Sequence, residues 1–387
     1  MSSTNDLLTM LYWVIGMVLV IFIIDWFWFK PYQEHNQTDR IIQRLRQKNR
    51  VFYQTLPKFN GRGIVIVLND TTVLAGSLLI LTMRRNLCKT PILVCYAGDD
   101  LAEQNRKFLE SIQNVATMAL GPKLDLPLET LRGTQARVYA LIYSPFQEVL
   151  MLEPDMLFFK NPEYLFGDSQ YRQTGALFWK DRKIQSYWDK KVYDWVRRLI
   201  PYRKGDNRIL DKKAGNYQSQ DLMLFNKTTH MKTLEKLWIL TKEWETVYNY
   251  IPGDKESYWI SSELAKEEHA FVPSYPGVIG ELHMDTLCGH TLYLDSSAQL
   301  LGWNGSLFHN GETRQVTDFT HYALFDREAE WNKVLGGCSC SNKCLKNTEY
   351  LELSGELRGI INEYARILHD LKNLLVTKSQ NDDGTEE

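Results

Sequence analysis

Two carboxylates one residue apart are the sharpest chemical signal in this chain, since Glu153 and Asp155 flank Pro154 directly after the apolar run 148–152. If the chain stays extended there, residues i and i+2 project to one side, so both carboxylates can converge on one divalent cation. Hard oxygen donors suit Mg²⁺ or Mn²⁺, which keep coordination positions open for substrate phosphates. On spacing alone, an acidic turn that ends a strand is the favoured interpretation.

The pattern of the chain indicates which elements must hold this acidic pair. Short apolar, β-branched runs typical of buried strands alternate with segments of helical pattern. The expected strands are 64–68, 91–96, 115–120 and 148–152, and the expected helices are 73–85, 100–112 and 134–144. This alternation predicts an α/β domain, a mostly parallel sheet with helices on both faces. Ligands bind beyond the carboxyl ends of such strands, so we expect chemistry in the loops after Leu68, Tyr96 and Leu152.

The second half of the chain, 170–335, is less periodic and rich in Trp and Tyr. We expect it to complete the same sheet and to build an acceptor cleft. Residues 351–376 carry apolar side chains at helical spacing, and this stripe must be buried. Packing on its own domain is favoured over a homodimer. The acidic end, 381–387, is expected to be a solvated tail.

Composition excludes several classes of protein. The chain has 387 residues, with 45 Lys and Arg against 47 Asp and Glu, so it lacks the basic excess of a nucleic-acid-binding protein. A hydrophobic content of 44% excludes intrinsic disorder. Six cysteines at irregular spacing are too few for a disulfide-built scaffold, although disulfides that include Cys288 are expected in an oxidising compartment.

The N-terminus carries an uncharged apolar stretch at 7–24. At about 1.5 Å per residue this stretch nearly crosses a hydrocarbon layer of roughly 30 Å, and the aromatic run 26–29 completes the span. Those rings and Lys30 are typical of a membrane interface, and no small-residue cleavage site follows them. We therefore predict an uncleaved signal anchor at 7–29 that inserts in a lipid bilayer.

The orientation of this anchor stays open. Residues 1–6 contain no Lys or Arg, whereas basic residues are frequent in 30–50, and the positive-inside rule then leaves the C-terminal bulk in the cytosol. Sequons for N-glycosylation favour a lumen instead. They begin at Asn36, Asn69, Asn226 and Asn304.

Further motifs carry a resemblance to a known family. They are Arg137 to Leu141, Ser144 to Asp155, Asn161 to Phe166, Gly175 to Arg182, Ser219 to Lys227 and Gly253 to Trp259. In this order and spacing, over 62–310, the chain resembles the fungal Golgi α-mannosyltransferases of glycosyltransferase family 71. The resemblance implies a GT-A-like, Rossmann-like fold behind an N-terminal transmembrane helix, a type II layout in the Golgi membrane, and transfer of α-1,2- or α-1,3-linked mannose from GDP-mannose.

The resemblance also implies a metal site. Glu153 and Asp155 stand at the Asp-x-Asp positions that bind Mn²⁺ or Mg²⁺, and His309 stands where related enzymes place a late His that joins the metal. An ordinary loop histidine is the alternative for His309. Glu153 departs from the usual Asp, and although the longer carboxylate can still ligate the ion, a weakened or inactive transferase stays open.

Donor-binding residues are implied in the same way. Arg137 stands where the family usually has Lys, and either cation can reach the donor diphosphate or an acidic partner. Asn69 and Asp70 follow the first strand, where the nucleotide base and ribose are expected. A strand-end turn is the alternative for that pair.

On the acceptor side, Asp221 is a catalytic candidate in an element that departs from the family's Glu-Ser-Gly-Gln pattern. Asp254 and Glu256 are further catalytic candidates, and Lys255 is grouped with the donor-binding residues. Their polar groups suit sugar hydroxyls, and Trp259 suits a sugar face. A charged helix start with Trp259 in the core is the alternative.

Together these expectations divide the chain into a tail at 1–6, the anchor at 7–29, a stem at 30–61, a GT-A-like domain at 62–335, and a Cys-containing loop, amphipathic helix and tail at 336–387. The expected function is metal-dependent, retaining transfer of mannose from GDP-mannose to a mannosylated glycan acceptor. The alternatives are a glycosyltransferase that uses another nucleotide sugar, and a non-catalytic sugar- or nucleotide-binding membrane protein on the same fold.

Overall fold

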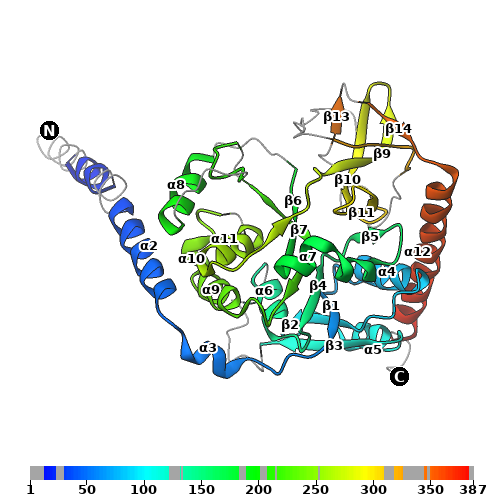
Figure 1. Ribbon diagram of the computed structural model, residues 1–387, viewed down its shortest axis with the longest axis horizontal. Helices are drawn as coiled ribbons and strands as arrows, with labels where there is room; N and C mark the ends of the chain where they lie inside the picture. The colour runs from blue at the N-terminus through cyan, green and yellow to red at the C-terminus, as the bar shows by residue number, and fades with distance from the viewer. Residues whose placement is uncertain are drawn as a thin grey trace, which may run out of the picture.

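The structure of the protein is a computed structural model in which two β-sheets lie among helices (Figure 1). Its described residues are 13–22, 30–121, 131, 134–182, 189–200, 207–213, 216–251, 253–308, 318–325, 344–346 and 349–382.

The first sheet has seven strands in the order β3-β2-β1-β4-β7-β6-β8. These strands are β1 (Arg62–Val67), β2 (Ile92–Ala97), β3 (Val115–Leu120), β4 (Glu148–Leu152), β6 (Ala176–Lys180), β7 (Gln218–Asn226) and β8 (Ala270–Phe271). The pairs β1 with β2, β2 with β3, β1 with β4 and β6 with β8 are parallel, whereas β7 runs antiparallel to both β4 and β6. The predicted mostly parallel sheet is therefore confirmed, with β7 as the strand that runs against its neighbours.

Both faces of this sheet are buried, as β-branched strands without polar alternation predict. Val65 and Met151 belong to the core on one face, and Ile64, Ile66 and Leu150 belong to the core on the other. The covering helices of the first half are α4 (Val73–Arg85), α5 (Glu103–Glu110) and α6 (Gln135–Tyr143). Helices on both faces are therefore also confirmed.

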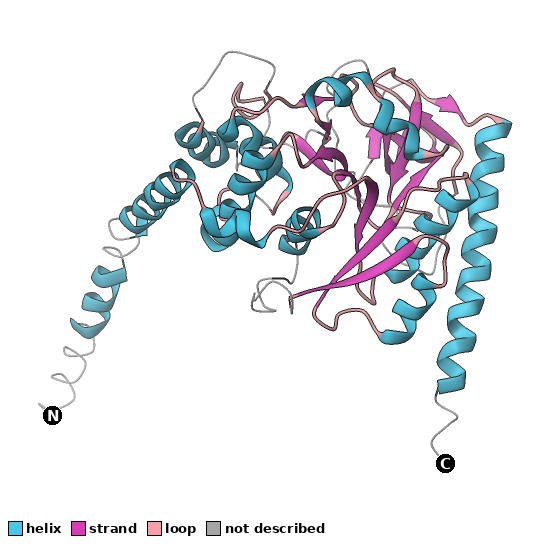
Figure 2. Cartoon of the chain, turned by 60° about the horizontal axis from the view of Figure 1, so that its bottom comes forward, coloured by secondary structure: helices cyan, strands magenta, loops and turns pink. Residues whose placement is uncertain are grey.

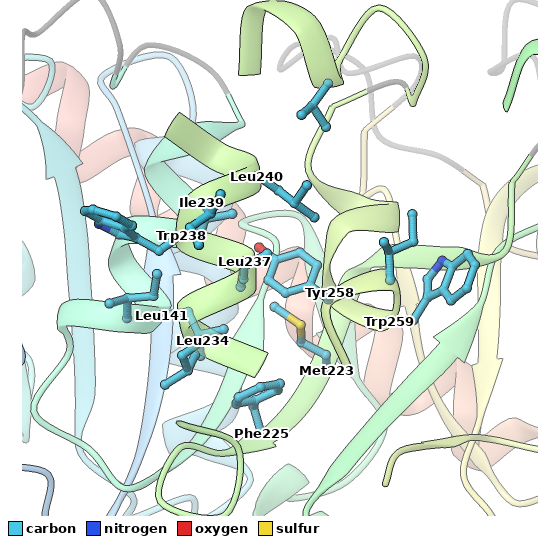
Figure 3. Close-up of a cluster of buried hydrophobic side chains, with 14 of the residues drawn as sticks. Leu141, Met223, Phe225, Leu234, Leu237, Trp238, Ile239, Leu240, Tyr258 and Trp259 are labelled. Atoms are coloured by element: carbon cyan, nitrogen blue, oxygen red, sulfur yellow. The ribbon is translucent and has the colours of Figure 1, made fainter. Parts of the chain in front are cut away.

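The helices of the second half complete the cover. They are α7 (Ser169–Thr174), α8 (Asp189–Leu199), α9 (Met231–Lys242), α10 (Trp244–Val247) and α11 (Lys255–Ala265), with a 3-10 helix η3 (Pro162–Gly167) before α7. Figure 3 shows how α9 and α11 contribute Leu237 and Tyr258 to a cluster that includes Met223 and Phe225 of β7. The contacts of α11 with α9 and with β7 hold this helix against the first sheet.

A second sheet was not expected from the sequence. It has the order β14-β12-β9-β10-β11-β5, and β13 pairs with β10. Its strands are β5 (Met156–Phe158), β9 (Gly277–His283), β10 (Thr286–Leu294), β11 (Leu300–Asn304), β12 (His321–Ala323), β13 (Cys344–Lys346) and β14 (Leu351–Glu352). The second half therefore completes the first sheet only in part and builds an antiparallel sheet besides.

Glycines allow the close strand pairing in this second sheet. Gly280 of β9 lies opposite Gly289 of β10, and a Cβ at Gly280 would lie 2.1 Å from the carbonyl oxygen of Cys288. Glycines weaken the apolar alternation by which a strand is predicted from sequence. The disulfide Cys288–Cys344 joins β10 to β13 and confirms the expected participation of Cys288.

The C-terminal helix α12 (Gly355–Asp382) packs on its own chain, in contact with α4 (Figures 1 and 2). Ile361, Tyr364 and Leu368 of its apolar stripe are buried, and the Tyr364 hydroxyl donates to the Phe158 carbonyl at 2.6 Å. The stripe is therefore covered by its own domain, as favoured. The helix begins at Gly355 rather than at Leu351, because Leu351 belongs to β14.

The N-terminal segment forms two helices that pack on the body, α2 (Lys30–Arg46) and α3 (Arg50–Thr55). Ile41, Leu45 and Phe52 are buried, in contact with the region of α9. Residues 13–22 form a helix whose apolar side chains are exposed. Within the described part of the chain, no helix combines the length and the apolarity needed to cross a membrane, and the rest of the expected anchor lies outside it.

Candidate functional site

A cavity of about 260 Å³ lies at the carboxyl ends of the parallel strands, where ligands bind in sheets of this kind. We call it the site cavity. Asn69 after β1, Arg137 of α6, Glu153 after β4 and Gln220 of β7 are among the residues that line it. Three residues predicted from the sequence, Asn69, Arg137 and Glu153, are therefore brought together.

Arg137 and Glu153 are in direct contact in the wall of this cavity. Arg137 forms an ion pair with Glu153, and these two side chains are 7% and 19% exposed. The same guanidinium donates to the Gln220 carbonyl, and its Nε lies 3.5 Å from Oδ2 of Asp254. The Glu153 amide donates to the Asp221 carbonyl at 2.9 Å, so β7 fixes the turn that follows β4.

Asp155 is held by the second sheet. Its carbonyl accepts hydrogen bonds from the amides of Gly305 at 3.0 Å and Ser306 at 2.7 Å, and its Oδ1 accepts one from the Asn304 side-chain amide at 2.5 Å. Asn304 is 8% exposed, so its nitrogen is engaged and buried rather than presented for glycosylation. Asn304 was noted in the sequence only as a sequon.

The predicted third metal ligand, His309, lies outside the described residues. Among the residues that are described, no group of three or more His, Cys, Asp or Glu side chains is arranged to hold a metal ion. Of the three predicted metal ligands, the structure therefore describes two, Glu153 and Asp155. Both offer carboxylate oxygens.

Asp221 is held by a tyrosine from the other sheet. The Tyr293 hydroxyl donates to Asp221 Oδ2 and lies 2.9 Å from the Ser219 hydroxyl, which accepts from the Asp221 amide at 3.1 Å. Burial, followed by the nearby charge of Asp221, raises the pKa of Tyr293, which therefore stays a neutral donor. No spacing signal in the sequence indicated Tyr293, because it lies 72 residues from Asp221.

Asp254 and Glu256 are completely buried, which corrects the expectation that they grip acceptor hydroxyls. Asp254 accepts from the Tyr258 hydroxyl at 2.7 Å, and Glu256 accepts from the Tyr217 amide at 2.8 Å and from the Trp259 indole at 2.5 Å. Burial raises the pKa of both carboxyl groups. Trp259 is also fully buried, so the core interpretation of this helix start is the one the structure supports.

Lys255 forms an ion pair with Asp181, with 2.8 Å between Nζ and Oδ2. Burial disfavours the charged amine, but the charges of Asp181 and Glu256, together with the hydrogen bond to Asp181, outweigh burial and raise the pKa of Lys255. Asp181 also accepts from the Asn216 side-chain amide at 3.0 Å. Lys255 is therefore an engaged cation, and it is not among the residues that line the site cavity.

Asn69 and Asp70 have different places. Asn69 lines the site cavity, and its Oδ1 accepts from the Thr72 amide at 3.0 Å in the turn that leads into α4. Asp70 accepts from the Ala102 amide at 2.9 Å and from the Asn105 side chain at 2.8 Å, so it fixes the start of α5 instead. The turn interpretation holds for both residues, and only Asn69 also lines the site cavity.

Comparison with known proteins gives a consistent family. A family model described as "Mannosyltransferase putative" matches residues 61–297. The chain is 23% identical over 260 residues to "Putative alpha-1,3-mannosyltransferase MNN14" of Candida albicans, covering 60% of this chain and 38% of that protein. It is 21% identical over 315 residues to "Alpha-1,3-mannosyltransferase MNT2" of Saccharomyces cerevisiae, covering 69% of this chain and 55% of that protein. The matched part thus spans about two fifths to about half of these relatives' length.

Among solved structures, the galactosyltransferase LgtC in complex with donor and acceptor sugar analogues is similar at a TM-score of 0.36 and 15% identity, covering 54% of this chain and 73% of that one. Core-mannan synthase A from Aspergillus fumigatus, in an Mn/GDP form, is similar at a TM-score of 0.36 and 9% identity, covering 56% of this chain and 74% of that one.

Proposed function

This chain belongs to the mannosyltransferase family, and we propose that it is a membrane-anchored, retaining glycosyltransferase that transfers α-mannose from GDP-mannose to a mannosylated glycan. The observation that carries the proposal is the site cavity, which lies at the carboxyl ends of the strands and is lined by Arg137, Glu153 and Asn69. A GT-A-like architecture is part of the proposal. The acidic turn after β4 and the mostly parallel sheet support it.

Arg137 is the residue we assign to the donor diphosphate. Its guanidinium is almost buried and lies between two carboxylates, so its planar set of donors is held in one orientation. A fixed cation of this kind stabilises charge that develops on a departing diphosphate. In a retaining transfer the bond between C1 of mannose and the diphosphate oxygen breaks while the acceptor oxygen bonds to C1 from the same side. The acceptor proton passes to the departing diphosphate, so this chemistry does not require a strong general base.

The donor chemistry of the site fits a divalent cation. Glu153 and Asp155 offer hard carboxylate oxygens on one turn, and Mg²⁺ or Mn²⁺ typically uses one or two carboxylates besides substrate phosphates. We propose that these two residues hold the ion, with His309 as a third ligand. The ion would supply further positive charge against the diphosphate of the leaving group.

Asp221 is the acidic residue that we keep for the acceptor side. It is partly exposed, whereas Asp254 and Glu256 are completely buried. One of its carboxylate oxygens is fixed by Tyr293, which orients the side chain. Asp254 acts through Arg137, which it helps to position, and Glu256 stabilises the start of α11.

We propose that the body lies in the lumen of the Golgi, behind a single-pass type II anchor. The Cys288–Cys344 disulfide supports this orientation, because disulfides persist in oxidising compartments. The basic residues after the expected anchor favour the opposite orientation. Protease protection in sealed microsomes decides between them, since a luminal body survives protease until detergent is added.

The test of the function uses the full chain in nanodiscs, because α2 and α3 pack on the body and their removal would uncover apolar side chains. The protein is incubated with Mn²⁺ and a panel of nucleotide sugars, with and without a mannobiose acceptor. Release of GDP that depends on Mn²⁺ and rises with acceptor is the expected result. Release of UDP alone would indicate another donor, and nucleotide binding without turnover would indicate the non-catalytic alternative.

A further inference from the structure

The four sequons for N-glycosylation have different surroundings in the structure. In a sequon the oligosaccharide joins the side-chain nitrogen of the Asn, Nδ2, and the Ser or Thr two residues later supplies a hydroxyl. A folded protein can carry the glycan only where Nδ2 is accessible and is not needed as a buried hydrogen-bond donor. The four residues to compare are Asn36, Asn69, Asn226 and Asn304.

Three of these positions do not suit a glycan. Nδ2 of Asn304 donates to Asp155 at 2.5 Å and the residue is 8% exposed, so a glycan would break a contact of the proposed metal site. Asn69 lines the site cavity, where a glycan would fill the space that the proposed donor needs. Asn36 lies about 10 Å along a helix from the expected end of the anchor, next to the lipid headgroups. The Thr38 side chain of its sequon is buried as well.

Asn226, at the end of β7, is different because its side-chain hydrogen bonds all use the oxygen. Oδ1 accepts from the Thr228 amide at 3.2 Å, from the Thr228 hydroxyl at 2.9 Å and from the Thr229 amide at 3.5 Å. Within the described residues, no hydrogen bond engages Nδ2, and Nδ2 is not one of the buried polar atoms. A glycan on Nδ2 leaves the same amide oxygen in place, so the turn keeps its hydrogen bonds.

The backbone of this sequon is held firmly while its outer side chains face solvent. The Asn226 amide donates to the Gly175 carbonyl at 2.7 Å. Lys227, the middle residue, is completely buried, and its ammonium group donates to the Ser144 carbonyl at 2.5 Å. Thr228 is exposed, and Asn226 is partly exposed. The turn therefore presents the two residues that form the sequon at the surface.

This position is remote from the site cavity. Gln220 of β7 lines the cavity, and Asn226 ends the same strand, roughly 20 Å away at about 3.3 Å per residue. Asn226 pairs with Glu148, the first residue of β4, whereas Glu153 follows the last residue of that strand. A glycan on Asn226 would therefore leave the site cavity open.

From these surroundings we propose that Asn226 is the N-glycosylated residue of this protein. The proposal rests on the luminal placement of the body in the proposed function, and its donor is an oligosaccharide linked to a lipid diphosphate. In the transfer, the bond between C1 of the oligosaccharide and the diphosphate oxygen breaks, and a bond between C1 and Nδ2 forms. The lipid diphosphate leaves with the electron pair, and Nδ2 gives up one proton to a base of the modifying enzyme. Because Lys227 is buried in the fold, this modification precedes folding.

The experiment uses the full chain, produced in a eukaryotic cell with a C-terminal tag that contains an Asn-Ser-Thr sequon. This tag reports on which side of the membrane the body lies. The purified protein is treated with an amidase that releases N-glycans in heavy-oxygen water, so that each Asn that carried a glycan becomes a labelled Asp. Mass spectrometry should find the label at the tag and at Asn226, and the folded protein should lack it at Asn69 and Asn304.

Two neighbouring threonines provide a matched pair of variants. Thr228→Ala removes the hydroxyl of the sequon and should abolish the label at Asn226. Thr229→Ala removes a hydroxyl that is also exposed but lies outside the sequon, and it should keep the label. Thr228→Ser restores a hydroxyl at the sequon position and should restore the label.

The tag separates the possible failures. A labelled tag with unlabelled Asn226 would overturn the proposal and leave the luminal placement intact. Absence of label at both the tag and Asn226 would overturn the proposal together with that placement. Label at Asn69 or Asn304 in the folded protein would overturn the choice among the four sequons. GDP release, which should be equal in Asn226→Gln and in the parent, reports separately on the proposed transferase.

Discussion

The guanidinium of Arg137 and the carboxylate of Glu153 form an ion pair in the wall of the site cavity. Arg137 comes from α6 and Glu153 from the turn after β4. The pair therefore joins a strand of the first sheet to a helix that covers this sheet. Asp254 lies on the other side of the same guanidinium and is completely buried. A cation in this position stabilises both carboxylates, and it is the group that we assign to the donor diphosphate under the proposed function.

Replacement of Arg137 by Ala should lower the free energy of unfolding by about 3 kcal/mol, because breaking a buried pair leaves an uncompensated charge. Urea unfolding followed by fluorescence measures the loss. Arg137→Lys is the matched control, since it keeps the charge with a shorter, less extended donor set. It should restore most of the stability, while the KM for GDP-mannose stays raised. An Ala variant as stable as the parent would contradict the structural part of this prediction.

Asp155→Asn should reduce Mn²⁺-dependent GDP release by on the order of 100-fold or more, because a charged ligand is lost. The fold should survive, since the backbone contacts of Asp155 with Gly305 and Ser306 do not involve the carboxylate, and an amide oxygen can still accept from Asn304. Steady-state rates across a Mn²⁺ titration, with circular dichroism as the folding control, give the answer. Full activity in a folded variant would remove Asp155 from the metal site.

Tyr293→Phe removes the hydroxyl that orients Asp221. We expect the acceptor KM to rise and the donor KM to stay unchanged, with a stability loss of about 1 kcal/mol. Tyr164→Phe is a matched control, because it removes a tyrosine hydrogen bond to Asp295 at 2.8 Å outside the site cavity. Equal kinetic effects in the two variants would argue against a positioning role for Tyr293.

Glu163 should make stability fall in acid. Burial opposes the charged carboxylate, but hydrogen bonds from Thr90, Asn161 and Lys89 outweigh burial and lower the pKa of Glu163 from 4.5 to about 2. Because its pKa is lower in the folded state, the ionised Glu163 stabilises the fold at a pH above 4.5. This contribution is lost as the pH falls from 4.5 toward 2.

Glu163→Gln should therefore lower the free energy of unfolding by about 2 kcal/mol at pH 7. The stability of this variant should also fall less steeply than that of the parent as the pH is lowered. Urea midpoints at pH 7, 4 and 3 measure the effect. Glu245→Gln, at an exposed glutamate of α10, should leave the profile unchanged. If the stability of Glu163→Gln fell in acid as steeply as that of the parent, other groups would be responsible for the loss of stability.

Much of the first sheet could be predicted from the sequence. The helix expected at 73–85 and the strands expected at 115–120 and 148–152 agree with α4, β3 and β4 at both ends. These elements are apolar runs or segments of helical pattern separated by polar turns, so local composition specifies them. The second sheet could not be predicted in this way, because glycines such as Gly280 and Gly289 interrupt the apolar pattern and matter only once two strands meet.

The sequence by itself determined the α/β class, the acidic turn at Glu153 and Asp155, and the family, since each depends on residues close together in the chain. Tertiary structure decided what those residues contact. It placed Asn304 against Asp155 and Tyr293 against Asp221, and it buried Asp254 away from solvent. These contacts join residues tens to more than a hundred positions apart, so they arise from the packing of the two sheets, which no local spacing encodes.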